Sequence, residues 1–288
     1  MNARTPARPA MTRPLALEAF AAQSACVVVE IAATAGSTPR EAGAFMLVSA
    51  TAHWGTIGGG RLELLAMANA RQVLVGQGVA MMDIPLGPDI AQCCGGRVKL
   101  SFQIADEPTL ARLGERRRQE ADAAPAVYVF GAGHVGRALA RSLGLLPLRL
   151  CVIDNRILEL AALPALTPTQ LSVMPEAVVR AAPPGSAVVV ATQDHALDFL
   201  IAAEALARDD LAYVGMIGSA TKRARFAHWY VREAGGSLDR LQGLTLPLGG
   251  AQVRDKRPEV IAALTAAELL QAFARHEQRS TEPAGAGT

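Results

Sequence analysis

The sequence feature that most constrains the fold is a glycine-rich turn, GAGHVG, which directly follows the apolar run AVYVF and opens a helical pattern. The turn fits G-x-G-x-x-G through Gly131, Gly133 and Gly136. In this motif the first glycine permits the tight turn, the second lets a phosphate approach the backbone, and the third allows close helix-to-strand packing. The helix N-terminus behind the turn favours an anion. The context predicts a Rossmann-like unit with a phosphate site, although the same glycines could serve only to shape the turn.

The pattern on both sides of this turn supports the same fold. After residue 125, strand-like and helical stretches alternate, which predicts a doubly wound parallel sheet covered by helices on both faces. We therefore expect an α/β protein whose Rossmann-like domain occupies residues 126–276. The expected strands are 126–130, 148–154, 187–192 and 212–218, and the expected helices are 134–144, 196–208, 219–234 and 258–275.

The N-terminal part has a different organisation. Residues 14–104 predict a smaller α+β domain, in which the convincing helix, 61–75, lies among apolar strands and two glycine-rich stretches. The polar stretch 105–125 is expected to be a partly helical linker, and residues 1–13 and 277–288 are expected to be disordered tails. The expected strands are 25–34, 44–50 and 97–104, and the glycine-rich stretches are 36–43 and 55–63.

Composition excludes several classes of function. The chain has 288 residues with a formal charge of +2 and 4% aromatic residues, so it lacks the basic surface and stacking platforms of a nucleic-acid binder. Although 51% of the residues are hydrophobic, no apolar run reaches the ~18–20 residues of a membrane span. The first residues show no apolar core of a secretory signal, so we expect a cytoplasmic protein.

Polar residues that follow the strands are candidates for the ligand crevice. Asp154 ends the strand after the glycine turn, where a carboxylate could hydrogen-bond a ribose or a similar polyol. The loop TQDHALD would lie across the switch point, so Asp194 and His195 could line the same crevice as His134. Asp194 could equally be a plain N-cap of the next helix. A metal site built from these histidines and Asp194 matches no compact ligand spacing.

The stretch AQCCGGRVKL, residues 91–100, contains adjacent cysteines in a loop setting. A disulfide between Cys93 and Cys94 would close a small, strained ring, whereas thiolates are soft metal ligands and good nucleophiles. Gly95 and Gly96 would let a bulky ligand approach, and Arg97 could lower a thiol pKa or hold an anion. Two inert thiols in a loop remain the alternative.

The sequence shows no familiar catalytic apparatus. None of the three tyrosines is followed by lysine four residues later, and no G-x-S-x-G, P-loop or H-E-x-x-H motif occurs. Cys26 and Cys151 lie in β-branched runs, where cysteine behaves as a small buried hydrophobe.

Several motifs in a fixed order resemble the XdhC family, the accessory proteins of bacterial xanthine dehydrogenase, from about Ala25 to Phe273. The resemblance implies a chaperone that binds the molybdenum cofactor in its molybdopterin form, presents it to a cysteine desulfurase for sulfuration, and inserts it into the molybdenum-binding subunit of xanthine dehydrogenase. Such a protein is a carrier, not an enzyme. The motifs are GSTPREAGAFMLV, GTIGGGRLE, QCCGGRV, VFGAGHVGRALA, the strand end from Asp154 to Arg156, IGSATKRARF and DKRPEVIAALTAAELL.

The resemblance implies a cofactor site with two ends. Cys93 and Cys94 would contact the molybdenum, and the Rossmann crevice would hold the phosphate. This sequence departs from the family's pattern at Gln193, where many relatives are expected to have a second histidine, and at Ala91, where glycine is common. The implied contacts are Gln92, Cys93, Cys94, Gly95, Gly96 and Arg97 at one end and Gly131, Gly133, His134, Gly136, Asp154, Asp194 and His195 at the other.

Two other functions are consistent with parts of the sequence. An NAD(P)-dependent oxidoreductase would use the Rossmann half, although the absent Tyr/Lys pair counts against it. A thiol redox protein centred on the cysteine pair lacks the C-x-x-C spacing of a low-strain active disulfide. A homodimer is expected on general grounds for a carrier with partners on two sides.

Overall fold

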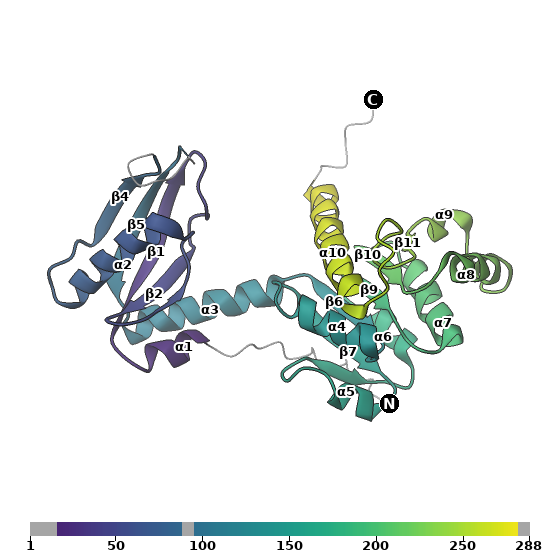
Figure 1. Cartoon of the computed structure of the whole chain (residues 1–288). Helices are drawn as coiled ribbons and strands as arrows, with labels where there is room; N and C mark the ends of the chain where they lie inside the picture. Colours follow the sequence, from purple (N-terminus) through teal and green to yellow (C-terminus); the bar gives the residue numbers. More distant parts are fainter. Residues whose placement is uncertain (1–15, 88–94, 282–288) are drawn as a thin grey trace, which may run out of the picture. The chain divides into compact units, whose positions relative to one another are not determined.

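The computed structural model describes residues 16–87 and 95–281 (Figure 1). The chain divides into two compact units, whose described parts are residues 16–119 and 120–281. The predicted α/β class, with a Rossmann-like C-terminal sheet and a smaller N-terminal sheet domain, is confirmed.

The C-terminal unit contains a six-stranded parallel sheet in the order β11-β10-β9-β6-β7-β8. The chain runs outward from β6 to β8, returns to the other side of β6 and runs outward again to β11. This is the doubly wound order of the Rossmann fold, and its switch point lies between β6 and β9. The strands are β6 (Ala126–Phe130), β7 (Arg149–Asp154), β8 (Thr169–Leu171), β9 (Ala187–Val190), β10 (Tyr213–Met216) and β11 (Leu244–Thr245).

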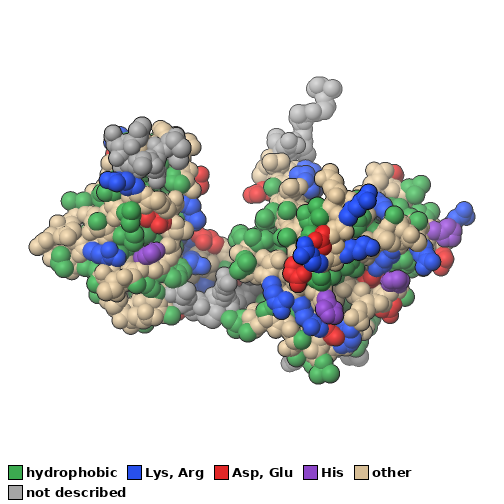
Figure 2. Space-filling model, in the orientation of Figure 1, with side chains coloured by type: hydrophobic (Ala, Val, Ile, Leu, Met, Phe, Trp, Pro, Cys, Tyr) green, Lys and Arg blue, Asp and Glu red, His purple; other side chains and the backbone are tan. Residues whose placement is uncertain are grey.

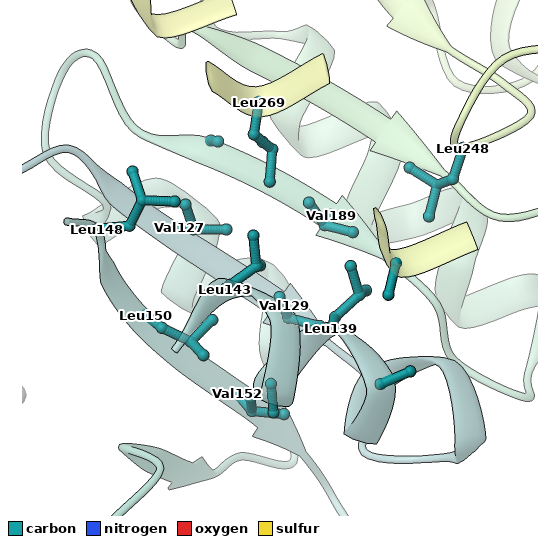
Figure 3. Close-up of a cluster of buried hydrophobic side chains, with 14 of the residues drawn as sticks. Val127, Val129, Leu139, Leu143, Leu148, Leu150, Val152, Val189, Leu248 and Leu269 are labelled. Atoms are coloured by element: carbon teal, nitrogen blue, oxygen red, sulfur yellow. The ribbon is translucent and has the colours of Figure 1, made fainter. Parts of the chain in front are cut away.

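Helices cover both faces of this sheet. Successive strand residues point to opposite faces, so Val127 and Val129 of β6 pack with α4 and α10, while Phe130 packs with α7 and α8. Figure 3 shows the first of these clusters, with Leu139 and Leu143 of α4 lying over the strands. Burial on both faces explains why the central strands read as continuous apolar runs. The helices are α4 (His134–Leu143), α5 (Ile157–Ala161), α6 (Pro175–Ala181), α7 (His195–Leu206), α8 (Ala220–Arg232), α9 (Leu238–Leu241) and α10 (Pro258–Thr281).

The N-terminal unit is built on an antiparallel sheet in the order β3-β2-β1-β5-β4. One face of β1 packs under α2 through Val27 and Val29, and the other face packs against α1 and α3 through Cys26 and Val28. The elements are α1 (Ala16–Ala21), β1 (Cys26–Ala35), β2 (Phe45–Ser49), β3 (His53–Gly55), α2 (Gly60–Leu74), β4 (Met81–Pro85), β5 (Arg97–Ile104) and α3 (Glu107–Ala123).

Cys26 and Cys151 are buried, as predicted from their apolar surroundings. Burial raises the pKa of both thiols, that of Cys151 to about 11. Because the thiolate is the reactive form, neither side chain is a nucleophile at neutral pH.

The stretch 105–125, expected to be a partly helical linker, contains α3, most of which belongs to the N-terminal unit. Leu110 and Leu113, one helical turn apart, pack against the sheet, and Arg116 donates to Glu30 of β1 at 2.5 Å. The boundary between the two units falls inside this helix, between Gln119 and Glu120.

Helix α10 extends further than expected. Helix α10 continues through Thr281, so residues 277–281 are helical. Polar residues can extend a helix in this way, because the helix is held by backbone hydrogen bonds. Residues 282–288 and the predicted tail 1–13 lie outside the described residues. Within the described ranges, no helix is both long and apolar enough to cross a membrane. Basic, acidic and hydrophobic side chains are interspersed on the face shown in Figure 2.

Candidate functional site

A cavity of about 250 Å³ lies at the carboxyl ends of β6, β7 and β9 in the C-terminal unit. Its lining includes Gly131 after β6, Asp154 at the end of β7, and Thr192, Gln193 and Asp194 after β9. Ligands of doubly wound folds bind in this position, where the strand order reverses. We call this cavity the crevice.

Two glycines of the turn are required by packing. Gly131 has φ +111°, and a Cβ on it would lie 2.3 Å from the carbonyl oxygen of Ala191. A Cβ on Gly136 would lie 1.9 Å from the carbonyl oxygen of Gly131. Each position is therefore closed to any larger residue, because the obstructing atoms belong to the backbone.

Gly133 is different, because nothing in the folded chain requires a glycine there. Its backbone is extended, with φ −68° and ψ −164°, which other residues also adopt. A Cβ on Gly133 would meet only the amide nitrogen of Gln193, at an ordinary contact distance of 3.6 Å. Gly133 is buried and does not belong to the lining of the crevice, so the folded chain alone neither requires a glycine there nor excludes a small side chain.

Asp154 lines the crevice, but its carboxylate is already engaged. One oxygen accepts from the backbone N–H of Arg156 and from its Nε, both at 2.9 Å. The other accepts from the N–H of Ala132 at 2.7 Å and from Nη2 of Arg156 at 2.8 Å. Burial alone would raise the pKa of Asp154, but the hydrogen bonds from Arg156 and Ala132 outweigh it, so the pKa lies below its usual value.

Arg156 also lines the crevice and is a further candidate site residue. Besides holding Asp154, its guanidinium donates through Nη1 to the side-chain oxygen of Gln193 at 3.1 Å. This contact joins the loop after β7 to the loop after β9, across the end of β6. The signal in the sequence is an arginine two positions after the acidic strand end.

The loop after β9 is anchored by two aspartates. Asp194 is the N-cap of α7 and accepts from the N–H groups of Ala196 at 2.8 Å and Leu197 at 3.3 Å, while it also lines the crevice. Both interpretations of Asp194 therefore apply. Asp198 is fully buried and forms an ion pair with Lys222 of α8.

The two histidines do not line the crevice, as had been expected of them. His134 and His195 are the first residues of α4 and α7, both are exposed, and neither belongs to the lining of the crevice. They start their helices at the solvent side of the turns. Across residues 16–87 and 95–281, no group of three histidine, cysteine, aspartate or glutamate side chains could hold a metal ion. A metal site built from these histidines and Asp194 is not supported.

The glycine pair of the cysteine loop lies in the N-terminal unit. Leu86 and the pair Gly95 and Gly96 exchange two backbone hydrogen bonds of 2.9 and 2.8 Å, which close the base of the loop between β4 and β5. A Cβ on Gly96 would lie 2.1 Å from the carbonyl oxygen of Ser37. The stretch 36–43 therefore packs directly against Gly96. Gln92, Cys93 and Cys94 lie outside the described residues.

A third glycine-rich stretch joins the same end of the N-terminal sheet. A Cβ on Gly58 would lie 2.6 Å from Cγ of Pro39, so residues 55–60 pack against the stretch 36–43. Glu63 of α2 holds this turn by accepting from the hydroxyl of Thr56 at 2.5 Å and the N–H of Ile57 at 3.0 Å. Burial alone would raise the pKa of Glu63, but these hydrogen bonds outweigh it, so the pKa lies below its usual value. The sequence identifies each glycine-rich stretch, but it does not show that the stretches pack against one another.

Arg97 begins β5 and pairs with a neighbour. Its Nε lies 2.6 Å from a carboxylate oxygen of Asp83 on β4, and the hydrogen bond and charge of Asp83 raise the pKa of Arg97. Its side chain is 54% exposed, so its charge remains accessible to an anion but is partly balanced by Asp83.

Comparisons with known proteins agree over most of the chain. Residues 127–269 match the family model of the XdhC Rossmann domain, and residues 19–84 match that of the XdhC and CoxI family. The uncharacterized protein YqeB of Escherichia coli (strain K12) is 27% identical over 257 residues, which are 85% of this chain and 43% of YqeB. The chain thus spans less than half the length of this relative.

A solved structure has the same fold. It is described as a xanthine dehydrogenase from Bacillus halodurans and is similar to this chain with a TM-score of 0.70 and 18% sequence identity. The similarity covers 90% of this chain and 94% of that chain. At this identity the likeness concerns the fold.

Proposed function

Because the chain belongs to the XdhC family, we propose that it is a carrier of the molybdenum cofactor that serves xanthine dehydrogenase. It holds the cofactor in its molybdopterin form for sulfuration by a cysteine desulfurase and inserts it into the molybdenum-binding subunit of xanthine dehydrogenase. Family membership supports an accessory role for xanthine dehydrogenase. When bound, the cofactor supplies a molybdenum atom whose terminal oxo ligand is exchanged for sulfido.

The crevice at the carboxyl ends of β6, β7 and β9, lined by Gly131 and Arg156, is the observation that carries this proposal. Molybdopterin ends in a phosphate, and the residues of the crevice fit such a group. The first amides of α4 lack partners inside the helix, and the N-terminus of the helix favours an anion. The guanidinium of Arg156, 38% exposed, belongs to the same lining, where Asp154 partly balances its charge. A volume of about 250 Å³ is below the ~300–1,000 Å³ of whole-ligand pockets, so the crevice suits one end of a cofactor.

In the N-terminal unit, the cysteine loop is the place where we propose contact with the cofactor. Cys93 and Cys94 offer soft thiolates, the ligand type that suits molybdenum bound by sulfur. The packing of Gly96 on Ser37 and the closed base at Leu86 support a loop that is held in place at its end. These residues bind and release a cofactor, so we propose a carrier role without catalytic turnover.

Xanthine dehydrogenase produced with this chain tests the proposal. In an Escherichia coli host that lacks YqeB, co-production with the wild-type chain is expected to give active enzyme. Omitting the chain, or using the Cys93→Ala/Cys94→Ala variant, is expected to lower the activity about tenfold or more, while the enzyme still assembles. Leu64→Ala, an exposed change on α2 of the same unit, is the matched control and is expected to match the wild type.

The molybdenum content of the purified dehydrogenase separates the two steps. Low molybdenum would indicate failed insertion, and normal molybdenum with low activity would indicate failed sulfuration. Full activity without the chain would contradict the proposed function, and full activity with the cysteine variant would contradict the role of the loop.

A further inference from the structure

The position of Asp154 raises the question of which ligands the crevice accepts. In Rossmann domains that bind dinucleotides, the acidic residue at the end of the second strand hydrogen-bonds the ribose hydroxyls. Asp154 ends β7, the second strand of this sheet in chain order, and lies next to the glycine turn. By position, the chain therefore has the residue that would bind NAD.

Arg156 takes up most of the acceptor positions of the Asp154 carboxylate. Each oxygen of Asp154 accepts two hydrogen bonds, three of the four in total come from Arg156, and a carboxylate offers about four acceptor positions. The Asp154 side chain is only 4% exposed. A ribose would have to displace a bidentate, charge-assisted pair, which is among the strongest contacts between side chains.

Arg156 also contacts the loop on the other side of the crevice. It donates to the side-chain oxygen of Gln193, whose amide nitrogen lies 3.6 Å from the position of a Cβ on Gly133. The pair of side chains therefore spans the glycine turn from the β7 side to the β9 side. The lining of the crevice contains Arg156 and Gln193 together with the carboxylates of Asp154 and Asp194, so Arg156 is the positively charged side chain that an anion would meet there.

We propose that Arg156 is a specificity residue that reserves the crevice for a terminal phosphate monoester and keeps out nicotinamide dinucleotides. Two features act together: the engaged Asp154 carboxylate offers no acceptor to a ribose, and the contact between Arg156 and Gln193 joins the two loops that line the crevice. The inference rests on the proposed function only for the identity of the phosphate ligand. The exclusion of dinucleotides follows from the crevice itself.

NADH titration of the full chain, followed by NADH fluorescence, tests this role. The wild type is expected to show no saturable binding at micromolar NADH. Arg156→Ala frees the carboxylate for two ribose hydrogen bonds and is expected to bind NADH about tenfold to a hundredfold more tightly than the wild type. NADPH is expected to gain nothing, because its 2′-phosphate would face the bare Asp154. The double variant Asp154→Asn/Arg156→Ala is expected to bind NADH no more tightly than the wild type.

Two further variants keep the test decisive. Arg180→Ala removes another arginine–carboxylate pair, with Glu204 at 2.8 Å, away from the crevice, and is expected to behave as the wild type. Arg156→Met keeps the apolar part of the side chain and replaces Arg156→Ala in the titration if that variant does not fold. Near-UV circular dichroism shows whether each variant is folded. Micromolar NADH binding by the wild type, or no gain in a folded Arg156→Ala or Arg156→Met, would overturn the assignment.

The outcomes also separate this inference from the carrier proposal. If the wild type excludes NADH and Arg156→Ala gains it, but the wild type does not retain the molybdenum cofactor, the specificity role stands and the carrier role fails. If the wild type retains the cofactor and also binds NADH tightly, the carrier role stands and the role of Arg156 fails.

Discussion

Gly136→Ala is expected to destabilise the C-terminal unit by about 3 kcal/mol or more, a large part of the stability of a typical domain. The added Cβ would lie 1.9 Å from the carbonyl oxygen of Gly131. Overpacking usually costs about 1–3 kcal/mol, and the upper end applies here because backbone on both sides prevents relief by a change of rotamer. The turn and α4 would have to move apart.

Gly133→Ala is the matched comparison within the same turn. Its backbone angles suit alanine, and only a weaker N-cap preference opposes the change, so the free energy of unfolding should fall by no more than about 1 kcal/mol. The methyl group would nevertheless fill the space assigned to the phosphate. We expect a folded protein with cofactor affinity lowered about tenfold or more.

Urea unfolding followed by Trp229 fluorescence in a Trp54→Phe background measures both effects in the C-terminal unit alone, because Trp54 lies in the N-terminal unit. Equal stability of the two glycine variants would show that the close approach of Gly136 to Gly131 does not exist. Unchanged cofactor affinity in Gly133→Ala would move the phosphate elsewhere.

Lys222→Met is expected to lower the free energy of unfolding by about 3–5 kcal/mol, because it leaves a buried charge without its partner. Asp198 is fully buried, and its remaining donors are the hydroxyl and N–H of Thr192 at 2.6 and 3.1 Å. Lys222 also donates to the carbonyl oxygen of Ile217 at 2.9 Å. The pair thus holds the loops after β9 and β10 together beside the crevice.

The double variant Asp198→Leu/Lys222→Met distinguishes the pair's attraction from the penalty of a lone charge. Replacing both partners with apolar groups is often neutral, so we expect it to recover much of the lost stability. Arg180→Ala, which breaks a largely exposed pair with Glu204, should change stability by at most about 1 kcal/mol. A Lys222→Met variant that is no less stable than Arg180→Ala would contradict the buried pair.

Much of the fold could be predicted because the central strands are buried on both faces. Burial of both faces of β6, β7 and β9 produces uninterrupted β-branched runs, and the glycine turn fixes the start of α4. The short edge strands β3, β8 and β11 carry few apolar residues and no clear period, so sequence alone does not reveal them. The sequence of α3 predicts only a partly helical linker, because its polar residues outnumber Leu110 and Leu113, the residues that anchor it.

The candidate site was only partly predictable, because its contacts depend on side-chain direction and on distant segments. Gly131 and Gly136 follow from the motif itself. The position of Asp154 also follows, but the fold-back of Arg156 onto its carboxylate depends on a side-chain conformation. The packing of Gly96 on Ser37 joins segments far apart in the sequence, which no local pattern encodes.

The retention of molybdenum cofactor by the purified chain tests the central claim most directly. The wild type, Cys93→Ala/Cys94→Ala and Gly133→Ala would be purified without oxygen, incubated with molybdenum cofactor and desalted, and bound molybdenum and pterin fluorescence would then be measured. We predict near-stoichiometric retention by the wild type and a clear loss in both variants. No retention by any of the three proteins would contradict the assignment of this chain as a cofactor carrier.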